Sequence, residues 1–249
     1  NLRPVKTFPA LYSQSPLKED RLIGVDFMVV RELTGGIYFG RPSEISEDGQ
    51  HSIDTCLYSK EEIRRVAVKA FDLAQKSKKK LTMVDKANVL STSRLWRKTV
   101  QEMSTDYPEV SVEYLFVDNA AMQLILRPNQ FDIILTENLF GDILTDEASV
   151  LPGSIGLQPS ASVGEKTAIF EPIHGSFPQA AGKNIANPFG MILSVAMMLD
   201  YQFGLKEEAA AIENIVDKAL LAQVGTEDLF PNSPLSTSAV GEWVIQRLA

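Results

Sequence analysis

Short apolar runs alternate with amphipathic stretches along most of the chain, and this pattern predicts alternating strands and helices. We expect strands at residues 25–30, 81–84, 110–117, 131–135 and 166–170. We expect helices at residues 61–77, 93–103, 120–126, 142–150, 188–203, 206–222 and 237–248. Regular alternation of the two element types favours an α/β fold over a helical bundle or a β-sandwich.

Two segments interrupt this alternation. Residues 41–52 contain too much Pro, Ser, Glu, Asp and Gly for a core element, and they predict an exposed arm or loop. Residues 152–156 carry two glycines and predict a crossing between two domains. We therefore expect one domain over residues 1–152 and a second over residues 153–249.

Composition narrows the class of protein. The chain has 249 residues with 45% hydrophobic content, which is enough for a sizeable core. Its formal net charge of −8 argues against a nucleic-acid partner. No apolar run approaches the roughly 20 residues that cross a membrane, and the first residues lack the pattern of a secretory signal. We expect a cytoplasmic protein that binds neither nucleic acid nor membrane.

The single cysteine and two histidines limit the metal chemistry that the chain can support. One cysteine cannot form an internal disulfide, which suits a reducing compartment. A zinc cluster of His and Cys ligands cannot be assembled from this set. Any bound metal must therefore be held by oxygen ligands.

Asp142 and Asp146 are the strongest candidate ligands of this kind. They stand four positions apart, so a helix would place both carboxylates on one face, within reach of one divalent cation. Paired acidic residues more often mark a solvated helix start. Here, however, the pair follows the apolar run at 131–135, and open α/β sheets bind ligands beyond the carboxyl ends of their strands. This context favours a metal site.

Three further charged residues follow predicted strands: Arg31, Lys86 and Asp118. Each alone is explained as well by a structural charge, but together they describe a site assembled from separate strand ends. Arginine binds carboxylates through paired hydrogen bonds, and a lysine among cations can lose its proton near neutral pH. Asp118 adds a third oxygen ligand to the aspartate pair. The set suits metal-assisted oxidation of a hydroxy acid.

A second group of polar and small residues lies at 171–188, and it is not a G-x-G-x-x-G motif. Its glycines and small residues would let the backbone approach a nucleotide, with His174 contacting adenine by stacking or by a hydrogen bond. A tight structural loop with a solvent-facing histidine explains the same residues, and the pattern alone leaves both interpretations open.

Longer motifs point to a known family. They are residues 1–4, residues 30–40, residues 84–90, the Asp142 motif and the His174 loop. With them the chain resembles, over essentially all its length, the isocitrate/isopropylmalate dehydrogenase family of β-decarboxylating dehydrogenases. The segments Leu33-Thr34-Gly35-Gly36 and Lys86-Ala87-Asn88-Val89 resemble the isopropylmalate branch more than the isocitrate, homoisocitrate or tartrate branches.

The resemblance implies a two-domain fold whose first domain is split in the sequence and incomplete in this chain. It implies that Arg3 and Arg31 bind the malate carboxylates and that Val89 contacts the isopropyl group. The proton-transfer pair would be Tyr38 and Lys86, with Asp118 assisting the lysine. The ligands of Mg²⁺ or Mn²⁺ would be Asp118, Asp142 and Asp146.

The resemblance also implies NAD as cofactor and a homodimer with shared active sites, because Lys86 and Asp118 reach into the partner's site in this family. The residues expected to bind NAD are Glu171, His174, Gly175, Ser176, Gln179 and Asn187. Gln179 is a departure, since most members have an acidic residue there. A neutral amide can hydrogen-bond a ribose hydroxyl but does not repel a 2′-phosphate, so we expect weaker discrimination against NADP.

The implied reaction is oxidation and decarboxylation of (2R,3S)-3-isopropylmalate to 4-methyl-2-oxopentanoate, in leucine biosynthesis. Family members carry roughly a hundred residues before the segment that matches Asn1, and these include the first glycine-bearing βα unit, a further substrate arginine and nicotinamide contacts, so we expect residues 1–249 alone to be inactive. Two alternatives stay open. One is a dehydrogenase for another malate-type acid, such as tartrate or homoisocitrate, and the other is a truncated, non-catalytic dimerisation module.

Overall fold

The computed structural model describes residues 1–248, which form two compact units. Unit 1 contains Asn1 and Phe27–Glu147, and unit 2 contains Leu2–Asp26 together with the chain from Ala148 onward. Residues 2–26 thus group with the C-terminal part, which differs from the predicted division at residue 152. Whether the units correspond to the second domain and half of the first domain stays a prediction. No helix within residues 1–248 is long and apolar enough to cross a membrane.

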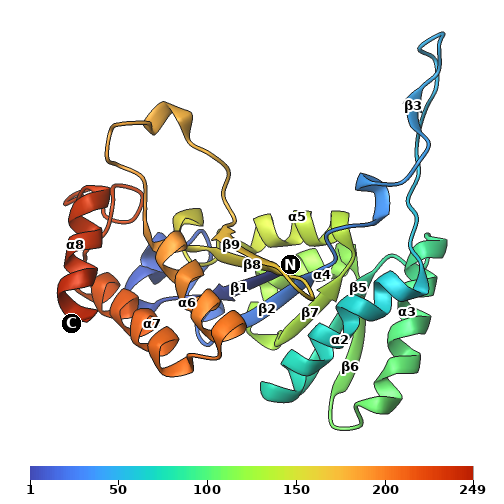
Figure 1. The fold of residues 1–249 in the computed structure, drawn as a ribbon, viewed down its shortest axis with the longest axis horizontal. Coiled ribbons are helices and arrows are strands. Elements are labelled where there is room, and N and C mark those ends of the chain that lie inside the picture. Colours follow the sequence, from blue (N-terminus) through green and yellow to red (C-terminus); the bar gives the residue numbers. More distant parts are fainter. Residues whose placement is uncertain (249) are drawn as a thin grey trace. The chain divides into compact units, whose positions relative to one another are not determined.

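Unit 1 is built on a parallel sheet with the strand order β6-β5-β7-β2. Its strands are β2 (Asp26–Arg31), β5 (Lys80–Asp85), β6 (Ser111–Phe116) and β7 (Ile133–Thr136). Its main helices are α2 (Lys60–Lys76), α3 (Ser91–Met103), α4 (Val117–Leu126) and α5 (Asn138–Ala148). Figure 1 shows strands and helices alternating along the chain in this unit, as the apolar pattern predicts.

Helix α2 shows how the sequence specifies these elements. The Ser59 hydroxyl accepts the backbone N–H of Glu62, and the Glu62 carboxylate accepts the N–H of Ser59, forming a capping box. The apolar stripe of the helix is buried and consists of Ile63, Val66, Ala67, Ala70, Phe71 and Ala74. This stripe has the helical period expected for a face packed on a sheet.

The polar segment after Tyr38 forms an exposed hairpin, as the sequence predicts for an arm. It contains two short antiparallel strands, β3 (Ser43–Ile45) and β4 (Ser52–Asp54), which pair only with each other. Figure 1 shows this hairpin extending away from the sheet of unit 1. All six strand residues are exposed, including Ile45 and Ile53.

Unit 2 contains antiparallel strands in the order β1-β8-β9, namely Leu2–Lys6, Pro159–Val163 and Ala168–Pro172. Its long helices are α6 (Phe189–Phe203), α7 (Lys206–Leu221) and α8 (Thr237–Leu248). Helix α6 packs on β8 and β9 and against α7. Phe189, Val216 and Leu229 are among the fully buried residues of its core.

Several elements differ from the sequence-based expectation, including α4, which begins at Val117 and not at 120. Strands β1 and β8 were not predicted, because each is short and interrupted by proline or serine. Helix α5 begins at Asn138, not at 142, because the side chain of Glu137 accepts the backbone N–H of Phe140 at 3.1 Å and caps an earlier first turn. Asp142 consequently lies in the second turn.

We expect Phe71→Ala to lower the free energy of unfolding of unit 1 by about 3–5 kcal/mol. The Phe71 side chain is fully buried and stacks on Tyr107 with ring centroids 4.4 Å apart, so truncation leaves a cavity. Urea unfolding measures the change. Val68→Ala on the exposed side of the same helix is the matched control and should change stability by no more than about 0.5 kcal/mol.

Candidate active site

The strand ends of unit 1 bring the predicted charged residues to one edge of the sheet. Arg31 is the last residue of β2, and Lys86 directly follows β5. Asp118 lies in the first turn of α4 after β6, and Asp142 lies on α5 after β7. The parallel register pairs Arg31 with Thr136 and Val84 with Thr136, so the carboxyl ends of these strands are level. This is the edge at which open α/β sheets bind ligands.

Arg31, Tyr38 and Asp142 form the first cluster. The Arg31 side chain is only 5% exposed, and its Nη1 pairs with Oδ1 of Asp142. The hydroxyl of Tyr38 donates a hydrogen bond of 2.7 Å to Oδ2 of the same carboxylate. The guanidinium carbon lies 5.7 Å from the centroid of the Tyr38 ring. A cation, a carboxylate and a phenol therefore meet at one point.

This arrangement raises the pKa of Tyr38 above its ordinary value. The main cause is the hydrogen bond to Asp142, because a phenol that donates to a carboxylate is stabilised in its neutral form. Partial burial and the negative charge of Asp142 act in the same direction, while the nearby Arg31 opposes them. Tyr38 therefore holds its proton at neutral pH, as a proton donor must.

Lys86 and Asp118 form a second cluster. The lysine Nζ donates to Oδ1 of Asp118 at 2.7 Å, and this hydrogen bond lowers the pKa of the Asp118 carboxyl. The backbone N–H of Lys86 donates to Oγ of Ser93 at 3.0 Å, which anchors the turn after β5. The residue before Lys86, Asp85, is buried and pairs with both Nε and Nη2 of Arg97. Val89 lies in the following turn with its side chain exposed.

Asp142 and Asp146 stand one turn apart on α5, and their carboxylates are the hard oxygen donors that Mg²⁺ or Mn²⁺ prefers. Within residues 1–248 no group of three His, Cys, Asp or Glu side chains is placed to hold a metal ion. Asp118, the third predicted ligand, pairs with Lys86 instead. The donor set on α5 thus fits part of a divalent cation site, whose remaining positions would be filled by further oxygen ligands.

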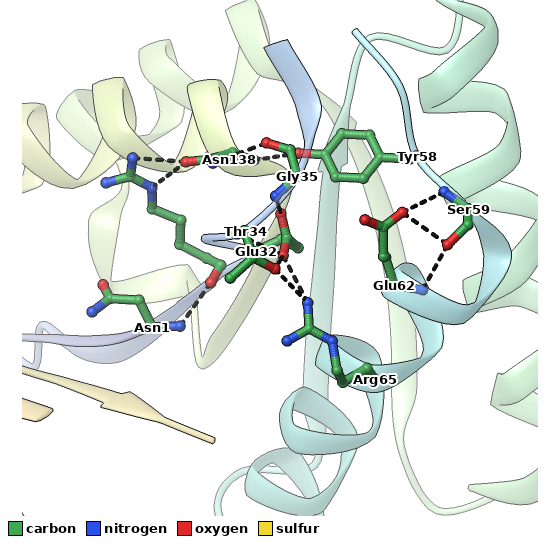
Figure 2. Close-up of polar contacts among 10 residues, drawn as sticks. Asn1, Glu32, Thr34, Gly35, Tyr58, Ser59, Glu62, Arg65 and Asn138 are labelled. Atoms are coloured by element: carbon green, nitrogen blue, oxygen red, sulfur yellow. Dashed lines mark hydrogen bonds and ion pairs between the residues drawn. The ribbon is translucent and has the colours of Figure 1, made fainter. Parts of the chain in front are cut away.

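A buried polar network behind Arg31 contains residues that the sequence did not single out. The side-chain oxygen of Asn138 accepts hydrogen bonds from Nε and Nη2 of Arg31 at 3.1 and 2.8 Å. Figure 2 shows Asn138 next to Gly35 and Tyr58, with Glu32 below the turn at Gly35. Asn138, Tyr58 and Glu32 are all buried. No local motif predicts Asn138 or Tyr58, because their partners are distant in sequence.

Glycines allow the close packing of this network. Gly36 adopts a φ of +72°, and a Cβ there would lie 2.3 Å from the Tyr58 hydroxyl oxygen. At Gly141, a Cβ would lie 2.6 Å from Cγ of Arg31. Both positions therefore require glycine for the observed placement of Tyr58 and Arg31.

The residues predicted to bind a nucleotide all lie in unit 2. Glu171 belongs to β9, and His174, Gly175, Ser176 and Gln179 lie in the loop between β9 and α6. This loop is largely exposed, and a Cβ at Gly175 would meet no atom of the chain within 4 Å. Figure 1 shows it as a long excursion between β9 and α6. The loop thus has the open backbone that a nucleotide contact needs.

Asn187 has a structural role at the end of that loop. Its oxygen accepts the backbone N–H of Phe189 at 2.9 Å, and its amide donates to Asp228 at 2.9 Å. It therefore holds the start of α6 in place. Arg3, predicted to bind a substrate carboxylate, lies in β1 of unit 2.

Comparison with known proteins gives one consistent family. A sequence model described as isocitrate/isopropylmalate dehydrogenase matches residues 1–244. A 3-isopropylmalate dehydrogenase of Bacillus licheniformis is 54% identical over 242 residues, covering 96% of this chain and 65% of the relative. One of Geobacillus kaustophilus is 56% identical over 235 residues, with coverages of 93% and 63%.

The fold also resembles that of a solved structure. The crystal structure of isocitrate dehydrogenase from Methylococcus capsulatus superposes with a TM-score of 0.90 at 34% identity, covering 99% of this chain and 72% of that chain. The present chain thus spans about two thirds of the length of the curated relatives that it matches.

We expect Asp142→Asn to lower the pKa of Tyr38 toward the ordinary value of about 10. The amide carries no charge, so it no longer stabilises the protonated phenol. Ultraviolet titration of tyrosine ionisation, with Tyr38→Phe subtracted to isolate the Tyr38 signal, measures the shift. An unchanged or higher Tyr38 pKa in Asp142→Asn would contradict the role assigned to this hydrogen bond.

Proposed function

Because the chain belongs to the isocitrate/isopropylmalate dehydrogenase family, we propose that the complete protein is an NAD-dependent 3-isopropylmalate dehydrogenase. It oxidises and decarboxylates 3-isopropylmalate to 4-methyl-2-oxopentanoate, which is a step of leucine biosynthesis. The observation that carries this proposal is the cluster of Arg31, Tyr38 and Asp142 at the strand ends, in a chain that is 54% identical to a 3-isopropylmalate dehydrogenase.

The chain's own residues divide the reaction between them. Arg31, with Arg3, binds the carboxylates of the malate skeleton through charge-assisted hydrogen bonds. The amine of Lys86, oriented by Asp118, accepts the proton of the hydroxyl group as the alcohol is oxidised to a ketone. Carbon dioxide then leaves the neighbouring carbon, and the phenol of Tyr38 protonates the resulting enolate there. NAD, when bound, would supply the acceptor for the hydride that leaves the hydroxyl-bearing carbon.

The raised pKa of Tyr38 supports its role as the acid, since the phenol keeps its proton until the enolate needs it. Asp142 and Asp146, with Asp118, would hold Mg²⁺ or Mn²⁺. Such an ion, when bound, polarises the substrate oxygens and lowers the pKa of the hydroxyl. The open loop at Gly175 and the neighbouring residues Glu171, His174, Ser176 and Gln179 would bind NAD.

We further propose a homodimer with shared active sites, in which Lys86 and Asp118 of one subunit complete the site of its partner. Two exposed surfaces of unit 1 support an interface. The β3–β4 hairpin exposes Ile45 and Ile53, and α4 exposes Met122, Ile125 and Leu126. Apolar side chains gathered on one helix face are typical of surfaces that another chain covers. Within residues 1–248 no third His, Cys, Asp or Glu joins Asp142 and Asp146, which is consistent with a ligand contributed by a partner subunit.

The test is NADH formation by the complete protein with 3-isopropylmalate and Mn²⁺, compared with Lys86→Met. We expect the variant to lose about 10²- to 10⁴-fold in kcat, because it lacks the proton acceptor. Lys69→Met, exposed on α2, is the matched control. Tartrate and homoisocitrate serve as competing substrates. Higher kcat/KM with either of them would reassign the substrate, and no NADH with any of the three acids would refute the dehydrogenase proposal.

Mixing two inactive variants tests the shared site. In a heterodimer of Lys86→Met and Tyr38→Phe, one site receives both intact residues and the other receives neither. Random assortment makes half of the dimers mixed, with one of two sites intact, so about a quarter of the parent activity should return. If the variants exchange subunits and no activity returns, Lys86 and Tyr38 of the same subunit share a site.

We expect Gln179→Asp to increase the preference for NAD over NADP, because a carboxylate repels the 2′-phosphate that a neutral amide tolerates. The ratio of kcat/KM values for the two cofactors measures this preference. The control is Gln223→Asp, which introduces the same change on the exposed surface of unit 2. Gln158 is buried and is therefore not suitable as a control. An unaltered ratio in Gln179→Asp would show that residue 179 does not face the 2′ position.

A further inference from the structure

We propose that Asn138 is a positioning residue that fixes the rotation of the Arg31 guanidinium. Its single side-chain oxygen accepts both Nε and Nη2 of Arg31, at 3.1 and 2.8 Å, so it occupies the whole side edge of the guanidinium. Only the end edge formed by Nη1 and Nη2 is left to face Asp142 and a substrate carboxylate. This role deepens the proposed function and rests on it.

The orientation of the Asn138 amide is itself determined by its surroundings. Its side-chain nitrogen donates to the carbonyl oxygen of Gly35 at 3.1 Å, which directs the oxygen toward Arg31. Its backbone N–H donates to the hydroxyl of Tyr58 at 3.0 Å. Tyr58 is buried and packs edge-to-face on Trp96 with ring centroids 5.3 Å apart. A flipped amide would place two donors against the guanidinium, so the observed orientation is the only one that satisfies both ends.

The turn that holds Asn138 is anchored by a buried carboxylate. Glu32 accepts the backbone N–H groups of Thr34 and Gly35, each at 2.8 Å, and pairs with Arg65 at 2.9 Å. Figure 2 shows these contacts around the turn. The same turn leads into the short helix Gly36–Tyr38. One buried network therefore sets both the rotation of Arg31 and the start of the segment that carries Tyr38.

A neutral partner matters as much as the geometry. An aspartate at 138 would still accept from Arg31, but it would neutralise the positive charge that attracts the substrate. It would also place a carboxylate oxygen against the carbonyl of Gly35. Asparagine orients the guanidinium without adding a second negative charge to the one that Asp142 already supplies.

The competing interpretation is that Asn138 only begins helix α5 and stabilises the fold. Stability alone does not separate the two, because any loss of buried hydrogen bonds destabilises a protein. The Nε–H signal of Arg31 does separate them. Under the positioning role this N–H loses its acceptor in Asn138→Ala but keeps one in Asn138→Asp, whereas under a purely structural role both variants lower stability without changing the signal.

The experiment compares the complete protein with Asn138→Ala, Asn138→Asp and the control Asn129→Asp, which makes the same charge change at an exposed position of unit 1. Nitrogen-resolved NMR follows the Nε–H signal of Arg31, assigned by its loss in Arg31→Lys. We expect a slowly exchanging signal in the parent and in Asn138→Asp, and its loss or broadening in Asn138→Ala. In kinetics with 3-isopropylmalate, we expect Asn138→Asp to raise KM about tenfold or more, with a smaller change in kcat.

Two results would overturn the positioning role: an Arg31 Nε–H signal in Asn138→Ala as protected as in the parent, or loss of that signal in Asn138→Asp, whose carboxylate still accepts from Arg31. If Asn138→Ala does not fold, the Nε–H signal of Asn138→Asp decides. The NMR readout does not depend on turnover. A parent protein that does not oxidise 3-isopropylmalate would therefore refute the proposed function, while the Nε–H signal would still decide whether Asn138 orients Arg31.

Discussion

The burial of the Arg31 charge is the constraint on which the site depends. Removing a guanidinium from water costs several kcal/mol unless hydrogen bonds and an opposite charge replace its hydration. Arg31 at the end of β2 obtains both from α5, through Asn138 and Asp142. The strand end and the helix must therefore keep one relative position, and Gly141 is required because a Cβ there would lie 2.6 Å from Arg31. The relative position of β2 and α5 and the placement of these charges therefore depend on each other.

The buried and exposed parts of the site have different roles. Asn138, Tyr58 and Glu32 are buried and hydrogen-bonded, which restrains the turn at Gly35. The groups proposed to move protons are more open, since Tyr38 is 46% exposed and the Lys86 side chain is 24% exposed. The accessible reactive groups thus lie next to a buried hydrogen-bonded network. Such a network keeps the geometry of an accessible site precise.

The sequence predicted the strand-end residues but not the network that supports them. Arg31, Lys86 and Asp118 follow apolar runs, and parallel strands place such residues at one edge of a sheet whatever the details of packing. Asn138 has no such local signal. Its partners Gly35 and Tyr58 are 103 and 80 positions away, and only the folded chain brings them together. Strands β1 and β8 were missed for a similar reason, because their antiparallel pairing joins distant segments and their own residues are weak strand formers.

The sequence by itself determined the α/β class, most helices, the exposed arm and the family, because periodicity, turn residues and motifs are local properties that survive without coordinates. The tertiary structure alone decided how the chain divides into two units, where α5 begins and which edge of Arg31 is available. It also showed that Asp118 pairs with Lys86 while Asp142 pairs with Arg31 and Tyr38. These outcomes depend on burial and on competition among distant polar groups for partners, which no stretch of sequence contains.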